Sequence, residues 1–262
     1  MKLKVDDKAV FAATGGAPFQ CKRPCAVFIH GAGMNHIVWA MQARYFGHHG
    51  YGVLAVDLPG HGASAGPALE SIEEAAAWLL RMLDAAKVER AILIGHSMGG
   101  LVALAAAAVA PERVEKLAIL GGSGEMPVAS SLLELAQADD PRAYDLMALW
   151  GHHMGAQIGG HPTPGLWLMG GSLRLLARGE RGVLGIDLAA CNAYSGGPDA
   201  AAKVRCPALL VIGERDIMTP PRAGRALAEA IAGAEVAMIP AGGHMMLVEQ
   251  PDASLEALRS FV

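Results

Sequence analysis

The chain has 262 residues, 53% of them hydrophobic, which is enough to bury the core of one large domain. Its formal net charge is −4, and no run of Lys or Arg exceeds two residues. Nucleic acids and anionic membrane surfaces attract proteins that carry a positive field, which this composition does not supply. We therefore expect neither of them as a partner.

The N-terminus and the cysteines favour a cytoplasmic protein without a metal. Residues 1–10, MKLKVDDKAV, place two aspartates where a secretory signal has its apolar segment. The longest near-apolar run, residues 101–110, is too short to cross a bilayer. The four cysteines are too few and too scattered for a disulfide framework, and Cys21 and Cys25 lack a second pair at zinc spacing. We expect free thiols, no metal and no organic cofactor.

Short runs of Val, Ile and Leu alternate with longer helix-like stretches, a pattern typical of a mostly parallel central sheet flanked by helices. At the start of the chain, residues 2–5 and 9–13 can pair as an antiparallel hairpin at the sheet edge, with Asp6 and Asp7 in its turn. The later runs lack polar alternation, as expected of strands buried on both faces. They are residues 26–29, 53–56, 91–94, 114–120, 208–212 and 235–239. The sequence therefore predicts an α/β fold.

Two helices are indicated before residue 123. Ser71 and Glu74 have capping-box spacing at the start of one helix, and Pro111 ends the helix that follows Ser97.

One long segment then interrupts the alternation of strands and helices. Between residues 123 and 203, helix-like segments follow one another with no strand, and glycine-rich stretches flank them. We expect a core domain of residues 1–122 and 204–262, and a helical cap of residues 123–203 inserted after the sixth strand.

The stretch ILIGHSMGG, residues 92–100, contains the pattern G-x-S-x-G between an apolar strand and a helix-forming run. In that context the pattern is typical of a nucleophilic serine on a sharp strand-to-helix turn. Glycine is needed two positions before and two after the serine, because larger side chains would collide with neighbouring groups. The helix N-terminus behind Ser97 favours negative charge. We predict that Ser97 is the nucleophile.

An activated serine needs a base and a third group that orients the base. Asp216 follows the predicted strand at 208–212, and His244 follows the one at 235–239. Because the carboxyl ends of parallel strands meet at one edge of a sheet, we expect Ser97, Asp216 and His244 to converge there.

Other residues compete for the roles of acid and base. Glu214 and Glu125 remain alternatives to Asp216, whereas Asp57 is expected to anchor its own turn. His96 is adjacent to the serine, but neighbouring side chains on a tight turn point in different directions. We expect His96 to pack beside the turn.

Three further stretches follow strands: HGAG at 30–33, DLPGHGAS at 57–64 and GHMMLVEQP at 243–251. With the order Ser, Asp, His, the chain resembles the α/β-hydrolase fold superfamily over nearly its whole length, in particular capped serine esterases and haloperoxidase-like hydrolases. The resemblance implies an oxyanion hole formed by the backbone N–H groups of Ala32 and Met98.

These features predict a serine hydrolase that cleaves a small to medium carboxylic ester through an acyl-enzyme on Ser97. His36, after the His-Gly stretch, and Trp150 and Trp167, in the expected cap, are candidates for substrate contacts. Two alternatives stay open. A C–C bond hydrolase or an enol-lactonase would use the same triad, and a ligand-binding receptor of another functional class can retain it.

Overall fold

The apolar runs of the sequence form one eight-stranded sheet in a computed structural model that describes residues 1–161, 163 and 165–262. The strands are β1 (Lys2–Val5), β2 (Lys8–Ala13), β3 (Cys25–Ile29), β4 (Gly52–Val56), β5 (Ala91–His96), β6 (Val114–Leu120), β7 (Ala208–Gly213) and β8 (Glu235–Ile239). Their order is β1-β2-β4-β3-β5-β6-β7-β8. Neighbours from β4 to β8 are parallel, and the hairpin β1–β2 joins β4 in antiparallel orientation. The predicted α/β fold is confirmed.

Burial of the strands follows their place in the sheet. The interior strands β3, β4, β5 and β7 are buried along their whole length, as predicted, whereas Glu115 and Lys116 of the interior strand β6 are only partly buried. The prediction of burial on both faces is wrong for β8, where Glu235 and Val236 are exposed. This strand is apolar in sequence but forms the sheet edge, so only one side of it has a neighbouring strand.

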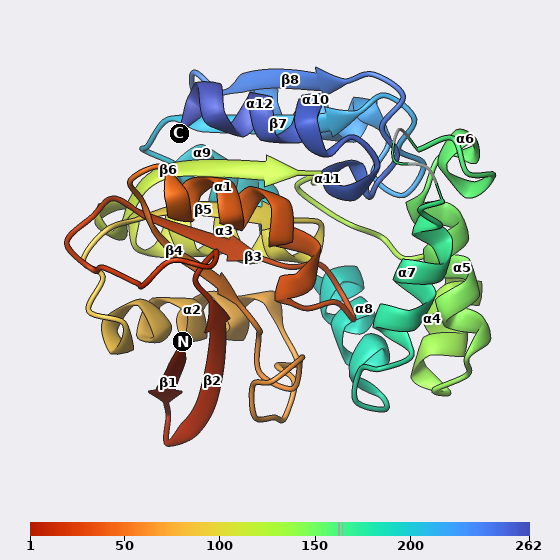
Figure 1. Cartoon of the computed structure of the whole chain (residues 1–262), viewed down its shortest axis with the longest axis horizontal. Coiled ribbons are helices and arrows are strands. Elements are labelled where there is room, and N and C mark those ends of the chain that lie inside the picture. The colour runs from red at the N-terminus through yellow and green to blue at the C-terminus, as the bar shows by residue number, and fades with distance from the viewer. Residues whose placement is uncertain (162, 164) are drawn as a thin grey trace.

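Helices cover both faces of the sheet (Figure 1). One face packs against α1 (Ala40–His48), α12 (Pro251–Phe261), the short helix α11 (Met246–Glu249) and the 3-10 turn η1 (His36–Trp39). The other face packs against α2 (Ile72–Ala85), α3 (Met98–Val109) and α10 (Pro221–Ala230). The hydroxyl of Ser71 caps α2 by accepting from the N–H of Glu74 at 3.1 Å. The turn η2 (Pro111–Arg113) follows α3 and leads into β6.

Six helices lie between β6 and β7, with no strand among the residues described there. They are α4 (Ser130–Gln137), α5 (Arg142–Gly151), α6 (Met154–Gln157), α7 (Leu168–Leu176), α8 (Val183–Ala193) and α9 (Gly197–Lys203). Helices α4–α8 stand beyond the carboxyl ends of the parallel strands (Figure 1). By contrast, α9 packs against α3 and α10 on the face of the sheet. The helices that extend away from the core are therefore α4–α8, which we call the cap.

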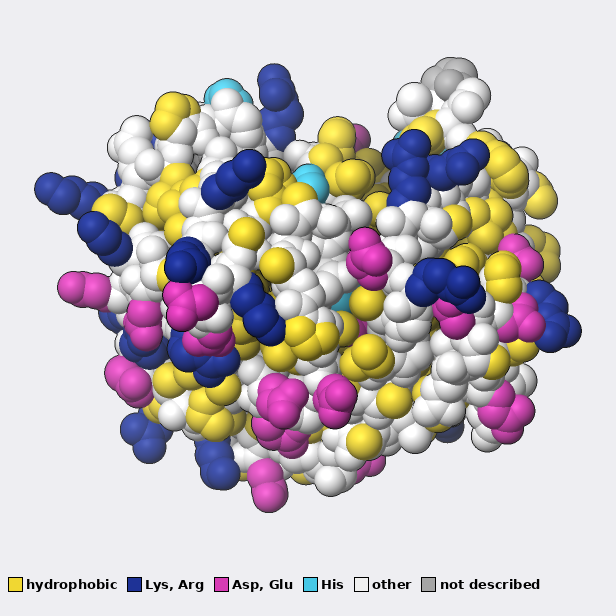
Figure 2. Space-filling model, turned by 90° about the horizontal axis from the view of Figure 1, so that it is seen from below, with side chains coloured by type: hydrophobic (Ala, Val, Ile, Leu, Met, Phe, Trp, Pro, Cys, Tyr) yellow, Lys and Arg dark blue, Asp and Glu magenta, His cyan; other side chains and the backbone are white. Residues whose placement is uncertain are grey.

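The surface carries charges of both signs. On the face shown in Figure 2, Lys and Arg side chains are interspersed with Asp and Glu, and apolar atoms lie between them.

Among the described residues no helix has both the length and the apolar character that a bilayer span requires. Nor does that part of the chain bring three or more His, Cys, Asp or Glu side chains together as a metal site.

Candidate active site

Ser97 sits at the turn from β5 into α3, in a conformation rarely seen for a residue with a side chain. Its φ is 53° and its ψ is −121°, and strain of this kind clusters at functional sites. A Cβ atom at Gly95 would overlap the carbonyl oxygen of Gly99, and one at Gly99 would overlap that of Ile29. The turn therefore needs both glycines, because the backbone passes too closely for any other residue.

Asp216 and His244 meet at the carboxyl ends of β7 and β8. His244 Nδ1 lies 2.9 Å from Asp216 Oδ2, and both side chains are buried. Because an ionised carboxylate only accepts hydrogen bonds, Nδ1 carries the proton and Nε2 is left as an acceptor. That is the tautomer a general base needs when it takes a proton from a serine.

The Asp216 carboxylate accepts more than the histidine bond. The N–H groups of Met218 and Thr219 donate to Oδ1 at 2.9 and 2.8 Å, and the hydroxyl of Thr219 donates to Oδ2 at 2.7 Å. Burial alone would raise the pKa of Asp216, but His244 and the Thr219 donors outweigh burial and lower it. The group therefore stays ionised next to His244.

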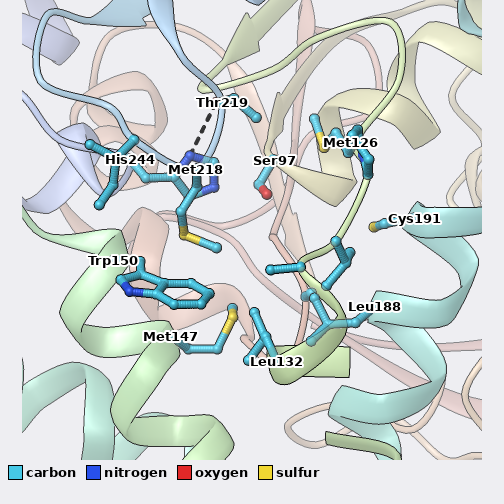
Figure 3. A pocket seen from close by; sticks show the side chains of 15 residues that line it. Ser97, Met126, Leu132, Met147, Trp150, Leu188, Cys191, Met218, Thr219 and His244 are labelled. Carbon is cyan, nitrogen blue, oxygen red and sulfur yellow. Dashed lines mark hydrogen bonds between the residues drawn. The ribbon is translucent and has the colours of Figure 1, made fainter. Parts of the chain in front are cut away.

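Ser97 and His244 line the same cavity (Figure 3). In the part of the chain that the structure describes, no hydrogen bond joins the Ser97 hydroxyl to His244, whose Nδ1 is shared between Asp216 and Thr219 at 2.9 and 3.2 Å. Catalytic hydrogen bonds are often long without substrate and tighten in the complex. The arrangement brings together the three residues predicted for the triad.

The alternative acids lie elsewhere. Glu125 is exposed, and Glu214 is exposed with its carboxylate accepting from the N–H of Ala241 at 3.2 Å. An acid at the carboxyl end of β6 would have to occupy a position such as Gly121, the first residue after the strand. Gly121 has a φ of +57°, and a Cβ atom there would lie 3.2 Å from His244 Nδ1. That position leaves little room for an acidic side chain.

His96 supports the loop that carries the proposed base. Its ring is fully buried, and its Nε2 lies 2.9 Å from the carbonyl oxygen of His244, to which it donates. Burial, together with the neighbouring His244 ring, lowers the pKa of His96 to about 3. His96 is therefore neutral, and its Nε2 proton is donated to the His244 carbonyl oxygen, so its role in the loop is structural.

The loop after β3 brings Ala32 next to Ser97 in the cavity wall. Within the described residues, the backbone N–H groups of Ala32 and Met98 donate to no other group. Met98 is the first residue of α3, so its N–H is one of the free donors at a helix N-terminus. Both groups are available for an oxyanion.

The cavity has a volume of about 350 Å³ and lies between the core, the segment that leads from β6 into the cap, and helices α4, α5 and α8 of the cap. Besides Ser97, Thr219 and His244, its walls are apolar side chains and one thiol. They come from Ala32, Met126, Pro127, Val128, Ala129, Leu132, Met147, Trp150, Leu188, Cys191, Ile217 and Met218. Among the residues that the structure describes, none of those lining the cavity is Lys, Arg, Asp or Glu.

Only one of the three residues predicted to contact substrate lines this cavity. Trp150 of α5 forms part of its wall (Figure 3). His36 instead donates from its backbone N–H and its Nδ1 to Asp57 Oδ1, both at 2.8 Å. Trp167 is 62% exposed at the start of α7 and is not part of the cavity wall. Asp57 also accepts from the N–H of Ala63, and therefore anchors its own turn as expected.

Glu249, which belongs to the stretch GHMMLVEQP, forms a buried cluster with two histidines that the sequence did not predict. Its carboxylate lies 3.2 Å from His152 Nδ1 and 2.7 Å from His153 Nδ1, both in the cap, and accepts from the N–H of Gly243 at 2.8 Å. Burial alone would raise the pKa of Glu249, but the two histidines lower it. The cluster ties the cap to the loop that bears His244.

The chain is similar in sequence to known hydrolases. A family model described as "Alpha/beta hydrolase family" matches residues 26–257. The (E)-2-((N-methylformamido)methylene)succinate hydrolase of Acinetobacter baylyi is 34% identical over 97 residues, 37% of this chain and only 36% of that protein. The pimeloyl-[acyl-carrier protein] methyl ester esterase of Chromobacterium violaceum is 30% identical over 249 residues, 90% of this chain and 92% of that protein.

Solved structures show the same fold. The enol-lactonase from Burkholderia xenovorans LB400 superposes with a TM-score of 0.87 at 23% identity, over 100% of this chain and 99% of that one. Since the family model covers residues 26–257, which is most of the sequence, the chain belongs to the alpha/beta hydrolase family.

Proposed function

We propose that the protein is a serine hydrolase that cleaves carboxylic esters with an uncharged acyl group. One observation carries the proposal: the buried Asp216–His244 pair and the strained Ser97 turn open onto a single cavity next to two free backbone N–H groups. Nucleophile, base, orienting carboxylate and oxyanion donors are the parts that acyl transfer needs.

The mechanism follows from these positions. Ser97 Oγ attacks the ester carbonyl carbon while its proton passes to His244 Nε2, and the carbonyl oxygen becomes an oxyanion held by the N–H groups of Ala32 and Met98. When the tetrahedral intermediate collapses, the C–O bond to the leaving alcohol breaks and His244 returns the proton to that alcohol. Water then attacks the acyl-enzyme by the same route, releasing the acid and restoring Ser97.

The walls of the cavity define the acyl group. Burying a charge without a partner is costly, and no charged side chain among the lining residues described would pair with a substrate carboxylate. The volume of about 350 Å³ lies at the small end of the range of about 300 to 1,000 Å³ that is typical of small-molecule pockets. We expect uncharged acyl chains of about four to eight carbons. The ester named for the Chromobacterium violaceum relative supports ester cleavage as the reaction.

Labelling and turnover test the proposal together. Wild-type protein should react with a fluorophosphonate and hydrolyse p-nitrophenyl esters over many cycles, with kcat/KM rising with acyl length and then falling. Ser97→Ala should lose both properties, since the reagent bonds to the serine oxygen. Ser131→Ala, which changes an exposed serine on α4, is the matched control and should keep both.

Two outcomes contradict the proposal. Labelling that persists in Ser97→Ala places the nucleophile at another residue. Labelling of Ser97 without turnover of any ester favours a C–C bond hydrolase or a receptor that retains the triad.

A further inference from the structure

Asp187 is a buried carboxylate of the cap that lies outside the proposed triad. It sits on α8 with 2% of its surface exposed. Its Oδ2 accepts from the backbone N–H of Gly33 at 2.8 Å, and it also lies 2.8 Å from His61 Nε2. Gly33 follows Ala32 directly, so the carboxylate is hydrogen-bonded one residue away from a proposed oxyanion donor.

His61 is the second group held by this carboxylate. Its Nδ1 faces the carbonyl oxygen of Pro59 at 3.0 Å, and its Nε2 faces Asp187. Because both ring nitrogens meet acceptors, both carry protons and the ring is a cation. Burial alone would lower the pKa of His61, but Asp187 outweighs burial and raises it. Asp187 and His61 therefore form a buried ion pair across the boundary between cap and core.

The loop around Gly33 has little freedom to adopt another position. Gly33 has a φ of +66°, and a Cβ there would lie 2.9 Å from Leu184 of α8 and 3.0 Å from Leu176 of α7. The N–H of Met34 also closes a turn onto the carbonyl oxygen of Gly31 at 3.2 Å. The loop is thus packed against the cap, and Asp187 fixes its direction with a charged acceptor.

The same helix also borders the substrate cavity. Leu188, the residue after Asp187, and Cys191, one turn further along α8, both line the cavity. One rigid element therefore contacts the acyl group and holds the loop of the oxyanion hole.

We infer that Asp187 is a positioning residue: through Gly33 and His61 it holds the Ala32 N–H in the direction of the developing oxyanion. The inference rests on the proposed function, because it assigns a support to that same site. A donor aimed at the oxyanion acts mainly in the transition state, so loss of aim lowers kcat and leaves substrate binding nearly unchanged.

A graded pair of variants tests this. Asp187→Asn keeps an oxygen acceptor of the same size but loses the charge, and Asp187→Ala removes the acceptor. We expect Asp187→Asn to lower kcat by about 10- to 100-fold with KM changed by about twofold or less, and Asp187→Ala to lower kcat further. The affinity of an alkyl boronic acid, which forms a tetrahedral adduct on Ser97, should fall by the same factor as kcat/KM.

The matched control is Asp139→Asn. Asp139 accepts from the N–H of Gly182 at the start of α8 at 3.0 Å and pairs with Arg181, so its change loosens the same helix without touching the loop at Gly33. This control should keep kcat and boronic acid affinity. Rates are normalised to fluorophosphonate-reactive sites, so a partly unfolded Asp187→Ala does not mimic the effect.

The outcomes separate this inference from the proposed function. A wild-type protein that reacts with fluorophosphonate but turns over no ester contradicts the proposed function, and the rate of that reaction in Asp187→Asn still tests the inference. A wild-type rate in Asp187→Asn, a rise in KM alone, or an equal loss in Asp139→Asn would overturn it.

Discussion

The core and the cap enclose one cavity but hold their sides of it by different interactions. On the core side, His244, Asp216 and Thr219 are fixed by a network of buried hydrogen bonds. On the cap side, Leu132, Met147 and the neighbouring residues of the wall meet the cavity with apolar surface. Hydrogen-bonded groups need one geometry, whereas apolar walls tolerate exchange for side chains of similar volume. We infer that the core supplies the reacting groups, and that the apolar wall of the cap determines which acyl group fits.

The largest effect should come from the core. Asp216→Asn keeps the shape of the carboxyl group but presents an amide to His244, which favours the wrong tautomer of the ring. We expect kcat to fall on the order of 10⁴ for every ester, whatever its acyl chain. Steady-state kinetics with short and long p-nitrophenyl esters measure this.

Glu214→Gln is the control for Asp216→Asn, because Glu214 lies on the same loop but is exposed. A surface change of this kind should alter kcat by about twofold or less. If Glu214→Gln instead caused the larger loss, the acid would be misassigned, and the network at Asp216 would have only a structural role.

A smaller, selective effect should come from the cap. Trp150 lines the cavity, so Trp150→Ala removes apolar contact with the acyl chain, and we expect kcat/KM for the preferred ester to fall by about 10- to 100-fold. Esters too short to reach Trp150 should be affected less. Trp167→Ala is the matched control, because this tryptophan is exposed and lies outside the cavity wall. A loss that is equal for all chain lengths would contradict the division of roles between core and cap.

The same division explains what the sequence could predict. The proposed catalytic residues follow strands and obey backbone rules: glycines at tight turns, a serine at a helix N-terminus, and polar groups at the carboxyl ends of parallel strands. Those rules located Ser97 and His244, which the structure brings to one cavity, and Asp216, which is hydrogen-bonded to His244. Thr219 was missed, although an aspartate that accepts from the N–H groups two and three residues onward is a common local pattern.

Side chains of the cap follow no such rule. Trp150 lies in α5 and Trp167 directly precedes α7, yet one lines the cavity and the other is exposed. The difference arises from how α5 and α7 pack, which depends on contacts far apart in the chain. For the same reason no motif indicated Asp187 or the pairing of Glu249 with His152 and His153.

The smallest predicted effect concerns the free energy of unfolding in mild acid. It differs between the histidines that are buried within the core and His61, which pairs with the cap. Burial lowers the pKa of His30 to about 4 and of His96 to about 3. His61, paired with Asp187 of the cap, has its pKa raised. A histidine with a lowered pKa stabilises the fold above its unfolded pKa of 6.5, and this contribution is lost as pH falls towards the folded value. The contribution of His61 has the opposite sign, being complete below 6.5 and lost as pH rises through its folded pKa.

Urea unfolding of wild type and His96→Asn at about pH 7.5 and about pH 5.5 isolates the core contribution. The unfolded chain binds a proton at residue 96 in this window and the folded chain does not. Wild type should therefore lose about 1.4 kcal/mol more unfolding free energy than the variant over that step. His30 and His61 contribute equally in both proteins, so their contributions cancel in the comparison. The folded pKa values of Asp216 and Glu249 are lowered, so these groups lose their stabilising contributions only at more acidic pH. His48→Asn, an exposed histidine, should follow wild type. If wild type and His96→Asn lost the same unfolding free energy between the two pH values, His96 would take up a proton while folded. That result would contradict the assignment of His96 as a neutral ring that supports the His244 loop.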